Sequence, residues 1–223
     1  MEELIKKEND IFDILQKFIG ANLDFIIVGG YAVSAYKHRF SVDADIVIRN
    51  KDLESFEGIL KKEGFKKTMQ KELENPYSSK FIRYEKDLAS VDMLIDALAS
   101  RTTNASFSYD LLAKNSKRRK IIGIEEEVTA MVPDKELLIV TKIHSSRLTD
   151  IRDIAALARD SDLETIRRFL FIGDLNTINE NLKKLNLAVN SKNFIDSFKG
   201  VFIEKKFDID LKQVEKISNL KKV

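Results

Sequence analysis

The stretch FIIVGGYAVSAYKHRFSVDADIVI, residues 25–48, decides how the fold is interpreted. A short apolar run, Phe25–Val28, ends at two glycines, and a second apolar run, Asp43–Ile48, carries two aspartates. The first run predicts a buried strand, Tyr31–Tyr36 a helix just after the glycines, and the second run another strand. Carboxylates are costly to place among apolar residues unless a cation compensates them. The stretch therefore predicts a strand, a glycine turn, a helix and an acid-bearing strand.

The composition is that of a folded protein without thiol chemistry. The 223 residues can form one large domain or two modest ones. With 38 basic and 36 acidic residues, a nucleic-acid role would need a local patch, and KNSKRRK at 114–120 is the densest basic run, which we expect to be a solvated loop. The absence of cysteine excludes disulfides and thiolate metal sites. The sequence shows neither a membrane span nor a signal peptide, so we expect a cytoplasmic protein with no membrane partner.

Hydrophobic periodicity predicts an α+β part followed by a helical part. Helices are expected over residues 3–20, 51–62 and 109–114, and strands over 65–70, 80–84 and 89–95, with ENPYSS at 74–79 as a turn and further strand pieces at 121–124 and 127–132. Beyond Pro133, helical segments are expected at 134–146, 150–159, 163–171, 175–185, 192–204 and 210–220. We therefore expect a mixed sheet flanked by helices over residues 1–133 and a helical domain over 134–223.

Three aspartates lie inside apolar strands. Asp43 and Asp45 are two residues apart, so both project from one face of their strand. Asp92 lies in LASVDMLID at 88–96, and it joins that face if the two strands are neighbours. Mg²⁺ and Mn²⁺ prefer oxygen ligands, and such a set suits two-metal phosphoryl chemistry. The alternative for Asp43 and Asp45 is an exposed strand end on which the acids only increase solubility.

The glycine pair fits the same site. A turn at Gly29 and Gly30 permits close backbone approach and can present helix N-terminal amides to a phosphate. Ser34 lies one turn into the following helix. The alternative is a tight turn that binds no ligand.

These residues resemble the signature of the nucleotidyltransferase (DNA polymerase β-like) superfamily. Its pattern is an apolar strand, Gly-Gly or Gly-Ser, a helix, and Asp-x-Asp in a strand. Gly-Gly-Tyr-Ala followed by Arg39-x-Ser41-x-Asp43-x-Asp45 is similar to the minimal nucleotidyltransferases related to AbiEii-type toxins. The segment VPDKELLIVTKIHSSRLTDIRDIAAL at 132–157 extends the resemblance. Ala44 departs from the pattern, which more often has a branched apolar residue there.

The resemblance implies a role for each matching position. Gly29 and Gly30 would cradle the triphosphate of an NTP, with Ser34 close to it. The acids would be the catalytic and metal-binding set: Asp43 and Asp45 ligate Mg²⁺ or Mn²⁺, and Asp92 is the third acid, which also helps to deprotonate the acceptor hydroxyl. The helical domain would complete the cleft and bind the nucleotide through Lys142, Arg147, Asp150 and Asp153.

The expected function is Mg²⁺-dependent transfer of a nucleotide from an NTP to a hydroxyl of RNA, a protein or a small molecule. A toxin-type enzyme with a cognate antitoxin fits the resemblance. One alternative is a nucleotide- or partner-binding module without turnover, against which the set of three acids argues. Another is a metal-dependent sugar transferase, against which the glycine pair ahead of Asp-x-Asp argues. The sequence does not separate the acceptors.

Overall fold

The chain forms two compact units. The computed structural model describes residues 2–41, 43–73, 79–199, 202 and 209–222. The first unit contains Met1–Ala35, Phe40–Leu98 and Phe107–Pro133, and the second contains Tyr36–Arg39, Ala99–Ser106 and Asp134–Val223.

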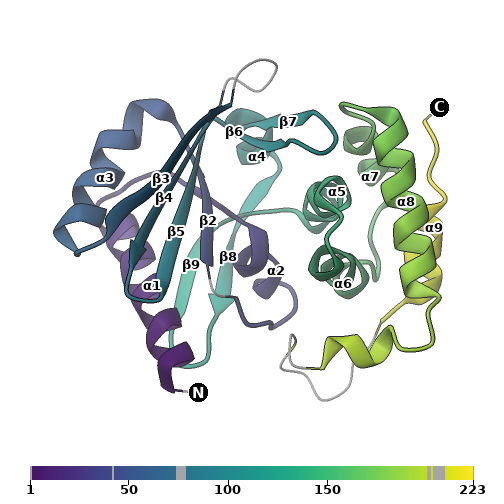
Figure 1. Ribbon diagram of the computed structural model, residues 1–223, viewed down its shortest axis with the longest axis horizontal. Coiled ribbons are helices and arrows are strands. Elements are labelled where there is room, and N and C mark those ends of the chain that lie inside the picture. Colours follow the sequence, from purple (N-terminus) through teal and green to yellow (C-terminus); the bar gives the residue numbers. More distant parts are fainter. Residues whose placement is uncertain (1, 42, 74–78, 200–201, 203–208, 223) are drawn as a thin grey trace. The chain divides into compact units, whose positions relative to one another are not determined.

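The first unit is built on one mixed sheet (Figure 1). Among the residues described, seven strands form it in the order β3-β4-β5-β2-β1-β9-β8. Their bounds are β1 Ile26–Val28, β2 Asp43–Ile48, β3 Lys66–Leu73, β4 Ser79–Lys86, β5 Ala89–Ile95, β8 Ser116–Ile122 and β9 Glu127–Pro133. The helices of this unit are α1 Glu2–Gly20, α2 Gly29–Ser34, α3 Leu53–Lys62 and α4 Tyr109–Lys114, with a 3₁₀ turn at Asn50–Asp52.

Strand β2 lies at the centre of the sheet. It pairs antiparallel with β1 and parallel with β5, while β3, β4 and β5 form an antiparallel meander. On the other side, β1 pairs parallel with β9, and β9 pairs antiparallel with the edge strand β8. The two strands that carry the acids are therefore neighbours, as expected.

One face of the sheet is apolar and covered by helices. Ala44, Ile46 and Ile48 of β2 are fully buried. Helix α1 contacts β5, β9 and α3, and Figure 1 shows α1 and α3 on the same side of the sheet. Because side chains alternate along a strand, the aspartates of β2 project from the opposite face. Val47, farther along the face of the acids, is also fully buried, so the acids lie at the start of a strand whose later residues are buried on both faces.

The second unit is mainly helical. Its helices are α5 Lys135–Ser145, α6 Leu148–Leu157, α7 Leu163–Leu170, α8 Leu175–Val189 and α9 Leu211–Ser218, with a 3₁₀ turn at Ile195–Phe198. Helix α5 packs against α6, α7 and α8, and its apolar residues are buried. Two short strands, β6 Ala97–Ser100 and β7 Ala105–Ser108, pair with each other, and only residues 99–100 and 105–106 of them belong to this unit. In the part of the chain that is described, no helix is both long and apolar enough to cross a membrane.

The α+β fold with a mixed sheet and helical C-terminal part is confirmed, and three local expectations are corrected. The run KNSKRRK is not a loop, because residues 116–120 belong to edge strand β8, which pairs with β9. The helix expected at 192–204 is only a 3₁₀ turn over Ile195–Phe198 in its described part. Strands β6 and β7 were not expected. Residues 74–78 of the expected ENPYSS turn and residues 200–201 and 203–204 of that helix lie outside the described residues.

Candidate active site

The three predicted acids lie side by side on one face of the sheet. Asp45 and Asp92 are direct partners in the parallel β2–β5 pair, and Asp43 is the partner of Ser90. Residues paired in this way project from the same face on strands about 4.8 Å apart. The predicted adjacency of the Asp43 and Asp92 strands is therefore confirmed.

Gly29 lies against the carboxylate of Asp45. A Cβ built on Gly29 would come within 2.8 Å of Asp45 Cγ and closer still to its Oδ2. The φ angle of Gly29 is +66°, in the left-handed region that favours glycine. Both observations give a physical reason for glycine at this turn, because any side chain would push against the acid.

The rest of the glycine turn is enclosed. Gly30 and Ser34 are buried in α2, and Ser34 Oγ donates to the backbone carbonyl of Gly30 at 3.4 Å. Gly30 lies four residues before Ser34, so this hydrogen bond joins the Ser34 hydroxyl to the backbone of its own helix.

Cations of the protein lie against Asp92 and Asp43. Arg83 of β4 donates from Nε to Asp92 Oδ1 and from Nη2 to Asp92 Oδ2, both at 2.7 Å. Lys7 Nζ lies 3.9 Å from Asp43 Oδ1, and Ser90 Oγ donates to the same oxygen. The bidentate bond to Asp92 raises the pKa of the Arg83 guanidinium, although partial burial opposes this. Arg83 is therefore a permanent positive charge beside the acids.

The donor set fits a hard divalent cation at Asp43 and Asp45. These carboxylates supply the oxygen ligands that Mg²⁺ and Mn²⁺ prefer, and Gly29 leaves room for one of them. Asp92 already has both oxygens engaged by Arg83. Within the described residues, no group of three His, Asp or Glu side chains is arranged to hold a metal ion. Asp43 and Asp45 therefore fit a divalent cation, and Asp92 lies beside them as a third acid.

The predicted residues of the second unit form a separate charge cluster. Lys142 lies in the last turn of α5, and its Nζ is 3.1 Å from Asp150 Oδ1 and 2.8 Å from Asp153 Oδ2, both on α6. Arg39 Nη1 donates to both oxygens of Asp153, at 2.5 and 2.6 Å. Both aspartates are fully buried. Arg147 also contacts Asp150, so the four residues that the sequence assigns to this region come together: Lys142, Arg147, Asp150 and Asp153.

The turn between α5 and α6 positions this cluster. Helix α5 ends at Ser145, the C-cap residue Ser146 adopts φ +51°, and Arg147 caps the start of α6. Asp150 accepts from the Arg147 backbone N–H at 3.0 Å and from its Nε at 2.8 Å. Burial alone would raise the pKa of Asp150, but Arg147 and Lys142 overcome this and lower it to about 2. The carboxylate is therefore ionised at neutral pH.

Sequence reasoning missed four residues of these clusters as site residues. Arg39 was part of the quoted signature but received no role, and Lys7, Arg83 and Ser90 received none. Arg83 could have been found from the hairpin: a two-residue turn at 87–88 pairs Lys86 with Ala89 and therefore Arg83 with Asp92. Ser90 follows from the parallel register opposite Asp43, which sequence alone does not supply.

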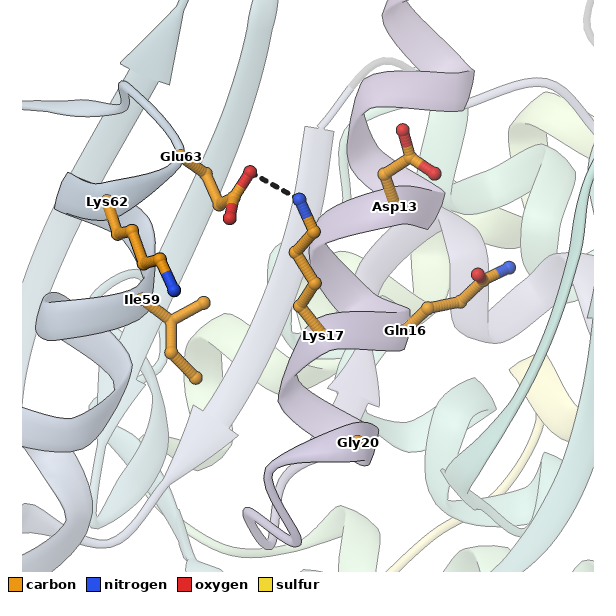
Figure 2. A pocket seen from close by; sticks show the side chains of 7 residues that line it. All are labelled: Asp13, Gln16, Lys17, Gly20, Ile59, Lys62 and Glu63. Atoms are coloured by element: carbon orange, nitrogen blue, oxygen red, sulfur yellow. Dashed lines mark hydrogen bonds and ion pairs between the residues drawn. The ribbon is translucent and has the colours of Figure 1, made fainter.

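A pocket of about 530 Å³ lies away from the acids, between α1 and α3 (Figure 2). It is lined by Asp13, Gln16, Lys17, Gly20, Ile59, Lys62 and Glu63. Lys17 and Glu63 form an ion pair across it. The lining has as many acids as lysines, and these helices cover the apolar face of the sheet. It therefore has no part in the candidate site.

Comparison with protein-family models and with curated proteins finds no match for the sequence. Solved structures are similar in fold. The antibiotic-resistance factor ANT(2'')-Ia aligns with a TM-score of 0.53 at 16% identity, covering 73% of this chain and 88% of that one. The same protein in complex with adenylyl-2''-tobramycin gives a TM-score of 0.50. JHP933 from Helicobacter pylori gives 0.50 at 13% identity, covering 98% of this chain and 91% of that one.

These alignments bear on the fold. The similarity to ANT(2'')-Ia extends over most of that protein's own length. In this chain, Asp43 and Asp45 lie on the central strand β2 of the mixed sheet. The chain thus has a nucleotidyltransferase-like α+β fold.

Proposed function

We propose that this chain is a Mg²⁺- or Mn²⁺-dependent nucleotidyltransferase that moves a nucleotide from an NTP to a hydroxyl acceptor. The observation that carries the proposal is the placement of Asp43, Asp45 and Asp92 on one face of adjacent strands, with Gly29 against Asp45. An exposed strand end that merely needed solubility would not require a glycine at the contact with one particular carboxylate.

Each residue has a definite part in this proposal. Asp43 and Asp45 would hold the divalent cation, which neutralises charge that develops on the transferred phosphorus. Asp92 is the third acid beside them. The resemblance assigns Gly29, Gly30 and Ser34 to the triphosphate, and Lys142, Arg147, Asp150 and Asp153 to the nucleotide. Lys142 would compensate phosphate charge.

The acceptor is proposed only as a hydroxyl. ANT(2'')-Ia has been solved with adenylyl-2''-tobramycin, which supports a small-molecule hydroxyl as one candidate. RNA and protein hydroxyls are also candidates, because the sequence resembles AbiEii-type toxins as far as residue 157. For a toxin of this type, a cognate antitoxin would be the partner. The basic edge strand β8, with Lys117, Arg118 and Lys120 exposed, is the feature that an RNA acceptor would use.

A second candidate is a nucleotide-binding module without turnover. The observation in its favour is that Arg83 occupies both oxygens of Asp92 and Lys7 approaches Asp43. The acids therefore have protein counter-ions, and the fold can keep them whether or not it binds a metal.

The test follows pyrophosphate release from each of the four NTPs with Mg²⁺. We expect Asp45→Asn to abolish turnover, because it removes a metal ligand while keeping the side-chain shape. Lys142→Ala should lower the rate by about 10²–10³, as for other lost charge-stabilising contacts. The matched control is Asp87→Asn in the exposed β4–β5 turn, which should leave the rate unchanged.

Two results would decide against the enzyme. Full turnover by Asp45→Asn would contradict the catalytic assignment. Tight NTP binding by the wild type, with no pyrophosphate released for any acceptor tried, would favour the binding module.

A further inference from the structure

The bond between Arg83 and Asp92 links two neighbouring strands of the meander. The two residues are direct partners in the antiparallel β4–β5 pair. Two parallel N–H···O bonds of 2.7 Å join the guanidinium to the carboxylate. Such bidentate pairs are among the strongest side-chain hydrogen bonds. The Asp92 side chain is only 7% exposed, against 32% for Arg83.

This bond lies directly beside the proposed metal ligands. Asp92 is the register partner of Asp45 across β2 and β5, so the charge of Arg83 lies on the same face, one strand beyond Asp92. A carboxylate that accepts two hydrogen bonds from a cation has less negative charge to offer a metal. A divalent ion close to Asp45 would also be repelled by the guanidinium.

We propose that Arg83 is the internal counter-ion of the acidic site and competes with the divalent cation for Asp92. The inference rests on the metal site of the proposed function. In the metal-free protein, Arg83 neutralises Asp92 and limits repulsion among the three acids. For an ion to gain Asp92 as a third ligand, at least one bond to Arg83 must break. The partly exposed guanidinium can then turn toward solvent.

A purely structural role for Arg83 predicts something different. If the pair only fastened β4 to β5, removing Arg83 would destabilise the hairpin and leave the ion affinity unchanged or weaker. Competition predicts the opposite combination: lower stability without metal, together with tighter binding of the ion.

The experiment measures Mn²⁺ binding by electron paramagnetic resonance without nucleotide. We expect Arg83→Gln to tighten Mn²⁺ binding about tenfold, because it removes a full positive charge close to the ion. Arg83→Lys keeps the charge but loses the two-bond geometry, so its affinity should lie between wild type and Arg83→Gln. The matched control is Lys80→Gln, which removes a positive charge from the same strand at a residue paired with Glu72. It should stay within twofold of wild type.

Thermal unfolding gives a second measurement. Arg83→Gln should melt below wild type without metal, and Mn²⁺ should raise its melting temperature by more than it raises that of wild type. Should Arg83→Gln fail to fold, Arg83→Lys decides the matter through the same two measurements.

The outcomes separate this inference from the proposed function. Binding in wild type that Asp45→Asn abolishes, with Arg83→Gln within twofold or weaker, overturns the role of Arg83 alone. No Mn²⁺ binding in either protein overturns both the metal site and the inference. Binding that appears only in Arg83→Gln supports competition in its strongest form.

Discussion

Replacing Gly29 by alanine tests how closely the glycine turn and the acid fit. The new Cβ would lie 2.8 Å from Asp45 Cγ and 3.1 Å from Asp45 Cβ, so the acid or the turn must move. Alanine at φ +66° also carries backbone strain. The strain costs roughly 1–2 kcal/mol, and overpacking costs at most about 1–3 kcal/mol, because Gly29 and Asp45 are only half-buried.

The expected loss of stability is therefore about 3 kcal/mol, which lowers the melting temperature of a chain this long by roughly 6–12 °C. The matched control is Gly64→Ala. Gly64 has φ +86°, but a Cβ there would meet no atom within 4 Å. Gly64→Ala should therefore show the cost of backbone strain without the cost of overpacking. Differential scanning calorimetry of both variants isolates the contact with Asp45.

A double-mutant cycle sharpens the test. In an Asp45→Ala background only the Cβ contact at 3.1 Å remains, so Gly29→Ala should cost less there. Mn²⁺ binding by Gly29→Ala should also weaken, because Asp45 is displaced. Equal losses for Gly29→Ala and Gly64→Ala, with Mn²⁺ binding unchanged, would refute the claim that Gly29 makes room for the acid.

Two further predictions concern the second unit. Burial lowers the pKa of His144 to about 4, so the unfolded chain binds the proton at a higher pH than the folded protein does. The free energy of unfolding should therefore be at its full value above about pH 6.5 and fall by up to about 3 kcal/mol as the pH drops toward 4. Chemical denaturation should show a smaller fall for His144→Asn, and an equal fall would contradict the assignment. Asp153→Asn should cost about 3–5 kcal/mol in urea unfolding, because Arg39 and Lys142 lose a buried partner. The exposed pair of Asp196 with Lys199 supplies the control, Asp196→Asn, which should cost less than about 1 kcal/mol; similar losses for the two variants would argue against a tightly coupled cluster.

Local rules predicted the acid-bearing strands well. The expected bounds 43–48 and 89–95 are those of β2 and β5, because alternation and flanking turns act within a few residues. The basic run at 114–120 was misassigned for a related reason. Its charges favour a solvated loop, whereas pairing with β9 and the burial of Ile121 make it an edge strand. Partners far along the chain override local preference there.

Local rules reach one of the cation partners of the acids and not the other. Arg83 reaches Asp92 only because the β4–β5 turn places two residues, Asp87 and Leu88, between the strands. Asp87 adopts φ +51°, a left-handed conformation that aspartate tolerates better than most residues. Arg39, by contrast, meets Asp153 across 114 residues of sequence. The Arg83 contact follows from the register of a two-residue hairpin, whereas the Arg39 contact depends on long-range packing that no short motif encodes.

The cations Arg83 and Lys7 weaken the argument that the three acids alone indicate a metal site. Three neighbouring carboxylates in a sheet suggest a metal because their repulsion needs compensation. Arg83 and Lys7 supply part of that compensation from the protein itself, so the acids alone do not demand an ion. The stronger argument for the site is Gly29, because a structural ion-pair network gives no reason to keep a residue without a side chain against Asp45. The case for metal chemistry therefore depends more on the contact at Gly29 than on the number of acids, and Gly29→Ala is the substitution that tests it most directly.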